Sequence, residues 1–302
     1  MKHKITLRRA MQYCIYKYPF LTRWLSDKAY LQLMYWVCIG KKLNLKAPRA
    51  FNEKMQWLKL YNRNPDYPAM ADKYAAKELI RKRIGEEYVP RTYAVWDSAE
   101  EIDFDILPDR FVLKCTHDCG GMVICHDKSK LDQGKAREKI ALALKRDYYY
   151  SGREWPYSKI VPKVIAEEFL EDRKTGELRD YKFFTFSGVP KLLFVASERQ
   201  AKNTETKFDF FDMDYEHLEL VNGHPNAGNP PEKPENFELM KELAAKLSEG
   251  TPHLRVDFYE ANGRVYVGEL TFFHWSGFVP FEPESWDLQM GDWLELPKEA
   301  RE

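Results

Sequence analysis

The sequence RVDFYEANGRVYVGELTF, residues 255–272, decides the fold of this chain. Two runs in which apolar residues alternate with other types flank the pair Asn262-Gly263, and this pattern is typical of a β-hairpin. Successive side chains of a strand point to opposite faces of a sheet, so the length of the connecting loop decides which residues of the two strands share a face.

Two loop lengths are compatible with this hairpin. A loop of two residues pairs Asp257 with Gly268 and sends the side chain of Glu269 to the opposite face. A loop of three residues, closed by a glycine bulge, pairs Asp257 with Val267 and Arg255 with Glu269. The longer loop separates a mostly apolar face from a polar one more cleanly. We therefore predict the three-residue loop, with Arg255, Asp257 and Glu269 together on the polar face.

The polar face of this hairpin has the composition of a metal and phosphate site. The carboxylates of Asp257 and Glu269 would lie beside the hydroxyl of Thr271 and the guanidinium of Arg255. Oxygen ligands suit a hard cation such as Mg²⁺, and an arginine next to them would stabilise an anion. The alternative interpretation is a salt-bridged sheet face, in which Arg255 pairs with one of the carboxylates.

The charge of the chain is unevenly distributed. The 302 residues carry no net charge, but residues 1–61 contain 13 lysines and arginines against two acidic residues. Basic side chains alternate with aromatic and aliphatic ones along residues 1–62. This predicts a helical segment with a basic amphipathic surface that contacts anionic lipid or an acidic glycan. The alternative is a helical lobe that packs on the domain behind it.

Length and composition predict a soluble globular protein with two lobes. No secretory signal is evident, and the most apolar run near the start, residues 29–40, is too short for a bilayer, which requires about 20 residues. Five cysteines at irregular spacing give no disulfide framework. We therefore expect a cytoplasmic protein.

Three lysines lie where a charge is uncommon. Lys73 lies in the first turn of a predicted helix, Lys114 in an apolar strand, and Lys182 in the apolar run DYKFFTF. After Lys114, the pair Gly120-Gly121 permits close approach of the backbone to a ligand. This glycine hairpin is suited to cover a polyphosphate, and a plain hairpin is the alternative.

The same hairpin contains sulfur and imidazole side chains, at Cys115, His117, Cys119, Cys125 and His126. Their spacing matches no paired-ligand zinc pattern, and neighbouring residues of a strand face opposite sides. We do not predict a zinc site.

These features follow one another along the chain as Asp72-Lys73, Lys114 with its glycine hairpin, the strand VIAEEFL at residues 164–170, Lys182, and the group Arg255, Asp257 and Glu269. This succession resembles the ATP-grasp superfamily. Five stretches are similar to its TupA-like branch, which is associated with teichuronopeptide and other surface-polysaccharide synthesis. They are FNEKMQWLKLYNRNP (51–65), ADKYAAKELI (71–80), FVLKCTHDCGG (111–121), RDYKFFTFSGVPK (179–191) and VDFYEANGRVYVGELTF (256–272). The resemblance covers about residues 51–283.

The resemblance implies an α+β fold in which a nucleotide lies between two α+β lobes. On this basis we expect an ATP-grasp domain over residues 63–302, with the glycine hairpin in a small lobe at about 108–170 and the metal-binding lobe at about 171–290. The basic helical segment, residues 1–62, would take the place of the usual N-terminal α/β lobe of the superfamily.

The resemblance also implies roles for individual residues. ATP and Mg²⁺ are the expected cofactors. Phosphate contacts fall to Lys73, Lys114 and the loop from Thr116 through Gly120 to Gly121. Adenine contacts fall to Glu167 and the backbone of Glu168, Phe169 and Leu170, and Asp180 would bind the ribose. Asp257 and Glu269 would bind Mg²⁺, while Arg255 and Lys182 would offset negative charge during the reaction. Where most relatives have an asparagine as a further ligand this chain has Thr271, so the third ligand is Thr271, a water or His274.

The activity that the resemblance implies is an ATP-dependent carboxylate-amine ligase. The expected partners are a carboxylated glycan, such as a uronic acid of a cell-surface polysaccharide, and an amino acid or other amine, with the reverse assignment as an alternative. The basic N-terminal surface would suit a peripheral contact with the inner membrane or a lipid-linked glycan, and we expect no nucleic-acid partner. The alternative functions are a sugar kinase, a glycosyltransferase that uses Asp212-Met213-Asp214, and a non-catalytic assembly protein at the membrane.

Overall fold

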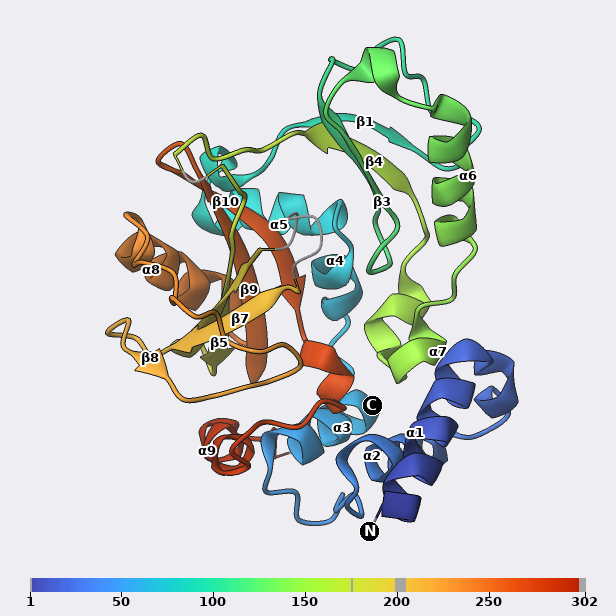
Figure 1. The fold of residues 1–302 in the computed structure, drawn as a ribbon, viewed down its shortest axis with the longest axis vertical. Coiled ribbons are helices and arrows are strands. Elements are labelled where there is room, and N and C mark those ends of the chain that lie inside the picture. The colour runs from blue at the N-terminus through green and yellow to red at the C-terminus, as the bar shows by residue number, and fades with distance from the viewer. Residues whose placement is uncertain (1, 175, 199–204, 299–302) are drawn as a thin grey trace.

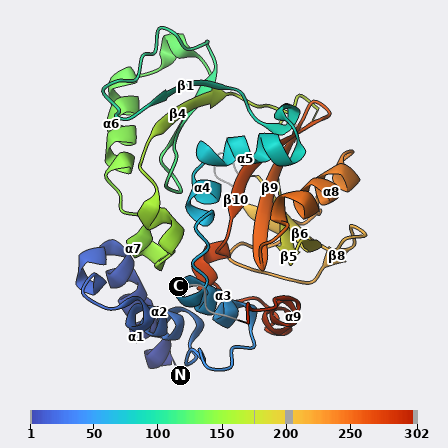
Figure 2. The same ribbon diagram turned by 180° about the vertical axis from the view of Figure 1, so that it is seen from behind.

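The computed structural model describes residues 2–174, 176–198 and 205–298. Two antiparallel sheets, each with its own helices, form two α+β lobes, as predicted (Figure 1). Between the two sheets run α4 (Tyr67–Ala71) and α5 (Ala75–Ile84), which Figure 2 shows from behind. The features predicted for a site converge on this region.

The large lobe is built on a six-stranded sheet with the order β10-β9-β5-β6-β7-β8. Its strands are β5 (Asp180–Phe186), β6 (Val189–Ser197), β7 (Lys207–Phe211), β8 (His217–Leu218), β9 (His253–Ala261) and β10 (Arg264–Thr271). On one face Phe183 packs against Phe237 of α8 (Phe237–Ser248). On the other face Phe184 and Phe186 pack against Phe51. The part of that second face around Phe184 and Phe186 is therefore hydrophobic core. The polar residues of the same face lie elsewhere along its strands.

The small lobe is built on a four-stranded sheet with the order β1-β4-β2-β3, backed by α6 (Gln133–Leu144). Its strands are β1 (Thr92–Trp96), β2 (Phe111–Cys115), β3 (Met122–Cys125) and β4 (Val164–Glu168). Leu113 of β2 and Ile140 of α6 belong to its separate hydrophobic core. Because β1 pairs with β4, this lobe begins before the expected start at about residue 108.

Helices dominate the N-terminal part of the chain, as predicted. The remaining α-helices are α1 (Lys2–Lys17), α2 (Asp27–Ile39), α3 (Phe51–Tyr61), α7 (Tyr149–Gly152) and α9 (Ser285–Trp293). Short 3-10 helices are η1 (Pro19–Thr22), η2 (Glu86–Tyr88), η3 (Lys128–Lys130), η4 (Trp155–Lys159) and η5 (His274–Gly277). The α3 residues Phe51 and Met55 belong to the core of the large lobe, whereas α1 and α2 form a cluster of their own. In the described part of the chain, no helix combines the length and apolar character needed to cross a membrane.

The hairpin of β9 and β10 corrects the predicted loop. Ala261 pairs with Arg264, so the loop consists of the two residues Asn262 and Gly263. Both have positive φ, 52° and 75°, as a type I′ turn requires. The prediction of a three-residue loop was therefore wrong.

A bulge at Gly268 nevertheless brings the two carboxylates to one face. Val267 pairs with Phe258, and Glu269 then pairs with Asp257, so that Gly268 has no partner residue on β9. A Cβ at position 268 would lie 2.7 Å from the ring of Tyr259, and this close approach requires glycine. The predicted shared face is correct, although the register that produces it is different.

Candidate functional site

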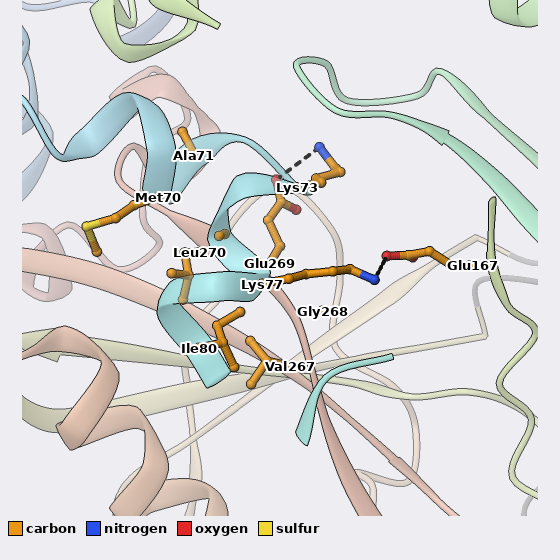
Figure 3. Close-up of a pocket in the computed structure, with 11 residues that line it drawn as sticks. Met70, Ala71, Lys73, Lys77, Ile80, Glu167, Val267, Gly268, Glu269 and Leu270 are labelled. Carbon is orange, nitrogen blue, oxygen red and sulfur yellow. Dashed lines mark ion pairs between the residues drawn. The ribbon is translucent and has the colours of Figure 1, made fainter. Parts of the chain in front are cut away.

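Lys73 joins three segments that are far apart in sequence. Its backbone N donates to the carbonyl of Thr116 at 3.1 Å, and its Nζ donates to the carbonyl of Asp118 at 2.7 Å. The same Nζ lies 3.6 Å from Oε1 of Glu269 on β10 (Figure 3). Burial alone would lower the pKa of Lys73, but the carboxylate of Glu269 raises it above its usual value. The lysine is therefore a fixed cation between the glycine hairpin and the large sheet.

The two glycines of the hairpin are needed for different reasons. Gly120 has a φ of 110°, which residues with a side chain rarely adopt. A Cβ at Gly121 would lie 2.6 Å from Oδ1 of Asp118 and 2.7 Å from Cβ of Ala143. In addition, the N–H of Gly121 donates to Oδ1 of Asp118 at 3.1 Å. Gly121 thus permits close packing of the hairpin on Ala143 of α6, and Gly120 permits the backbone conformation of its turn.

Glu167 of β4 lies between two lysines. Its carboxylate oxygens are 2.5 Å from Nζ of Lys77 and 2.6 Å from Nζ of Lys114, and all three side chains are largely buried. Burial would raise the pKa of Glu167, but the two ammonium groups hold it below its usual value. Lys77 also donates to the carbonyl of Pro90 at 2.7 Å. A phosphate group entering this space would therefore compete with Glu167 for Lys114.

Lys77 was missed by the sequence analysis. Lys77 lies on α5, which begins at Ala75, so Lys73 precedes this helix and does not lie in its first turn as expected. The spacing of four residues between the two lysines was the signal that could have found Lys77. Figure 3 shows Lys73, Lys77, Glu167 and Glu269 around one pocket, with apolar residues of α4, α5 and β10 on the side away from Glu167.

The polar face of the large sheet carries a second cluster of charges. Arg255 holds Asp257 with two hydrogen bonds, from Nε to Oδ1 and from Nη2 to Oδ2, each 2.7 Å long. Lys182, which pairs with Asp257 across β5 and β9, forms an ion pair with Oδ2 of the same carboxylate. Asp180 lies on the same face of β5, 3.5 Å from Nζ of Lys182. Burial would raise the pKa of Asp257, but Arg255 and Lys182 lower it, so the carboxylate is ionised.

A histidine and an asparagine hold Arg255 in place. Nη1 of Arg255 donates to Nδ1 of His274 at 2.7 Å, and Nε2 of His274 lies 2.8 Å from Oδ1 of Asn222. The amide group of Asn222 donates to the carbonyls of Val279 and Pro280, which orients its oxygen towards His274. The histidine is therefore protonated on Nε2 and accepts on Nδ1.

Both ring nitrogens of His274 are consequently in use. Burial, followed by the charge of Arg255, lowers the pKa of His274 far below its usual value, so the ring is neutral. A metal ion could therefore bind His274 only if Arg255 or Asn222 gave up its hydrogen bond to the ring. No sequence pattern links Asn222 to His274, because the two residues are 52 positions apart.

The carboxylates of Asp257 and Glu269 suit a magnesium-phosphate site better than a metal site built from protein alone. Within the described ranges, no group of three histidines, cysteines or acidic residues could hold a metal ion. Mg²⁺ is commonly bound by one or two carboxylates together with phosphates and water, and Asp257 with Glu269 provides such a pair. The Thr271 hydroxyl accepts from Nη2 of Arg255 at 3.0 Å and retains a second lone pair.

The residues expected around the base lie where β4 leaves the small lobe. The N–H of Glu168 donates to the carbonyl of Arg91 at 2.9 Å, and its side chain accepts from the N–H of the same arginine. The ring of Phe169 packs between Arg110 and His126. Leu170 is the next residue of the connection. Before β4, the N–H of Lys163 donates to the hydroxyl of Thr116, so this hydroxyl already has a hydrogen bond within the protein.

Comparison with known proteins gives one family and several distant structures. A family model described as TupA-like ATP-grasp matches residues 53–295. No curated protein matches. A D-alanine–D-alanine ligase from Bacillus anthracis, in complex with ATP, is 16% identical with a TM-score of 0.38 over 68% of this chain and 54% of its own. The ATP-grasp ligase PsnB with its minimal precursor is 13% identical with a TM-score of 0.43 over 75% and 62%. The chain thus spans little more than half the length of these ligases.

Proposed function

The chain belongs to the TupA-like ATP-grasp family, and from this premise we propose that it is an ATP- and Mg²⁺-dependent ligase that joins a carboxylate to an amine. The observation that carries the proposal is the pairing of Asp257 with Glu269 on β9 and β10, with Lys73, Lys182 and Arg255 around them. Three cations next to two carboxylates suit a metal-bound polyphosphate, in which negative charge exceeds that of the metal.

The nucleotide would lie between the lobes. Its phosphates would contact Lys73, Lys114 and the glycine hairpin, and Asp180 would bind the ribose. The base would lie against Glu167 and the connection of Glu168, Phe169 and Leu170. Mg²⁺ would be held by Asp257 and Glu269, with Thr271 as a further oxygen, and when bound it would draw negative charge from the phosphates. The side chain of Lys114 is 19% exposed, so a phosphate could reach its ammonium group. This supports a proposed change of partner from Glu167 to phosphate.

The proposed reaction has two steps. A carboxylate oxygen of the first substrate attacks the γ-phosphorus of ATP, the bond to ADP breaks, and an acyl phosphate forms. The amine of the second substrate then attacks the acyl carbon, loses a proton, and releases inorganic phosphate as the amide forms. Arg255, fixed by His274, would offset the negative charge that develops near the acyl carbon, and Lys182 would act beside it. No protein nucleophile is required.

For the carboxylate substrate we propose a uronic acid of a cell-surface polysaccharide, and for the second substrate an amino acid or other amine. A pocket next to the glycine hairpin supports this class of substrate. Aromatic and basic residues line it, among them His117, Arg146, Tyr148 and Tyr157. Tyrosine rings suit the faces of sugars, and a guanidinium suits a carboxylate. Arg146 also lies 3.5 Å from Oδ2 of Asp118, which connects the pocket to the loop that Lys73 holds.

The glycosyltransferase alternative has less support. Its motif, Asp212-Met213-Asp214, forms a turn after β7 in which Oδ1 of Asp212 accepts from the N–H groups of Asp214 and Glu216. This is a structural role for the first carboxylate. A sugar kinase would use the same ATP site and therefore has to be separated by experiment.

The test is the release of ADP with candidate substrates. The ligase predicts ADP release only when a carboxylated glycan and an amine are both present, together with a mass increase of the glycan equal to the amine minus water. A mass increase of one phosphoryl group without any amine would indicate a kinase. Release of UDP from a UDP-sugar would indicate a glycosyltransferase. No nucleotide turnover with any pair of substrates would favour the non-catalytic assembly protein.

A further inference from the structure

Within the part of the chain that the structure describes, exposed large apolar side chains are concentrated on α1, η1 and the turn that follows them. Seven of the fifteen exposed large hydrophobic side chains in the described residues come from positions 7–24. They are Leu7, Tyr13, Tyr16, Tyr18, Phe20, Leu21 and Trp24, and their exposed fractions run from 42% at Tyr18 to 81% at Trp24. A concentration of this kind is unusual for a surface that faces only water.

The same segment is strongly basic. Between positions 7 and 24 the sequence contains Arg8, Arg9, Lys17 and Arg23 and no acidic residue. The first acidic residue after it, Asp27, is turned towards the protein, since Arg63 lies 3.6 Å and Arg153 3.4 Å from its carboxylate. No negative side chain of this segment therefore offsets its cations.

The exposed rings present apolar faces. The indole N–H of Trp24 donates to the carbonyl of Leu21 at 2.8 Å, so this polar group is already satisfied within the protein while the ring projects outwards. Lys17 donates to the hydroxyl of Tyr13 at 3.0 Å and lies above the rings of Tyr13 and Tyr18. Aromatic rings interleaved with cations are the composition found at the boundary between lipid headgroups and acyl chains.

The segment is firmly attached to the fold. Ile15 of α1 is buried in the cluster that α2 forms. Nη2 of Arg153, just after α7, donates to the carbonyls of Thr22 and Leu25 at 2.8 and 3.4 Å. In Figure 1, α1 lies at the end of the molecule furthest from β1 and α6, outside both sheets. The rings are thus held outwards by a structured segment.

We propose that residues 7–24 form a docking surface for an anionic lipid bilayer. The rings of Phe20 and Trp24 enter the headgroup region, and Arg9, Lys17 and Arg23 pair with the negative charge of the lipids. Charge argues against an apolar protein partner or a second copy of this equally basic surface, because neither would compensate these cations, and the exposed apolar side chains favour a bilayer over a purely acidic glycan. The proposal is independent of the ligase activity.

The test is co-sedimentation of the full chain with vesicles. One set contains phosphatidylglycerol in phosphatidylcholine, and the other contains phosphatidylcholine alone. We expect the protein to sediment with the anionic vesicles only, and to be released by high salt because surface charges are screened. Phe20→Ala/Trp24→Ala and Arg9→Glu/Lys17→Glu should each reduce the partition coefficient at least about tenfold.

Matched controls change other exposed residues of the same type elsewhere. Ile106→Ala/Leu142→Ala removes side chains that are 60% and 58% exposed on the small lobe, and Lys82→Glu/Lys139→Glu reverses two exposed lysines. Both controls should sediment like the unchanged chain, and circular dichroism should show every variant folded. Equal sedimentation with neutral vesicles, or none with either set, would overturn the proposal. So would a loss of dimers in the Phe20→Ala/Trp24→Ala variant during size-exclusion chromatography, because this would identify a second copy as the occupant.

Discussion

His274 is a residue whose role follows from its two hydrogen bonds. A neutral ring that accepts from Arg255 and is held by Asn222 cannot take a proton on Nδ1 without facing the guanidinium with a second donor. The histidine therefore orients Arg255, and we predict that its effect on the reaction passes through that arginine.

Substitution His274→Phe should preserve the buried ring volume but remove the acceptor for Arg255. We expect the maximal rate of ADP release to fall about tenfold to a hundredfold, because the guanidinium loses its orientation, with little change in the KM for ATP. Steady-state kinetics measure both constants. A rise in the KM for ATP at an unchanged maximal rate would contradict this positioning role. Asn222→Ala, which removes only the outer partner, should give a smaller effect in the same direction.

Charged residues are conspicuous in apolar strands and near helix starts, and this made most of the site's charged residues selectable from the sequence. They are Lys73, Lys114, Lys182, Arg255, Asp257 and Glu269. Their partners could not be selected in the same way. Glu167 was visible, but its position between Lys77 of α5 and Lys114 of β2 depends on tertiary contacts that no local pattern reveals. Asn222 and His274 lie in connections without periodicity, so no pattern links them.

At the scale of elements, the hairpin of β9 and β10 depends on one inserted residue. Alternation of apolar and polar residues fixes the face of each strand separately, but it does not reveal where an extra residue interrupts the pairing. The three-residue loop was the simplest way to bring Asp257 and Glu269 together. The chain uses a two-residue loop and the bulge at Gly268 for the same purpose.

Gly268→Ala tests the bulge. The added methyl group would meet the ring of Tyr259, so we expect a loss of stability of about 1–3 kcal/mol in urea denaturation. The displacement of Glu269 should also reduce ATP turnover. Gly228→Ala is the matched control, since a Cβ there meets nothing within 4 Å and should leave both properties unchanged. A fully active and stable Gly268→Ala variant would show that the bulge does not depend on glycine.

The junction of α3 and α9 predicts a pH dependence of stability. Ala50, before α3, has no polar side chain, and Oδ1 of Asp287 on α9 accepts from the N–H of Asn52 instead. Burial raises the pKa of Asp287 to about 6, above the ordinary value of 3.8. Between these two values the folded protein binds more protons than the unfolded chain, so this group contributes a stability that is full below pH 3.8 and is lost as the pH rises through 6.

In Asp287→Asn that contribution should disappear. We expect the difference in unfolding free energy between the unchanged chain and Asp287→Asn to shift by about 1–2 kcal/mol between pH 4 and pH 7. Urea denaturation at both values measures it. Parallel pH profiles of the two proteins would rule out Asp287 as the titrating group.

At the scale of the whole molecule, ion pairs tie the two lobes together where the nucleotide would enter. Lys77 comes from α5, which packs on the large lobe, and reaches Glu167 of the small sheet. Lys73 similarly connects Asp118 of the glycine hairpin to Glu269 of the large sheet. The two-lobed α+β architecture was predictable from the order of the motifs. The extent of each lobe was harder to predict from the sequence, because β1 joins the small sheet and α3 joins the core of the large lobe only through tertiary contacts.

Lys114→Ala should weaken ATP binding by about tenfold or more, because one phosphate contact is lost. Isothermal titration calorimetry measures the dissociation constant. Lys77 would still pair with Glu167, so the fold should remain intact, and Lys139→Ala is a control for a lysine exposed on α6. An unchanged dissociation constant in Lys114→Ala would remove the glycine hairpin strand from the proposed phosphate site.

Glu269 permits the most direct test of the metal-phosphate site. Its side chain is 29% exposed and its ion pair with Lys73 spans 3.6 Å, so Glu269→Gln perturbs the fold less than a change at the buried Asp257 would. The measurement is the affinity for ATP, by calorimetry, with and without Mg²⁺, in the unchanged chain and in Glu269→Gln. We predict that the unchanged chain binds ATP with a strong dependence on Mg²⁺ and that Glu269→Gln loses most of this dependence. Failure of the unchanged chain to bind ATP, or the same Mg²⁺ dependence in both proteins, would contradict the assignment.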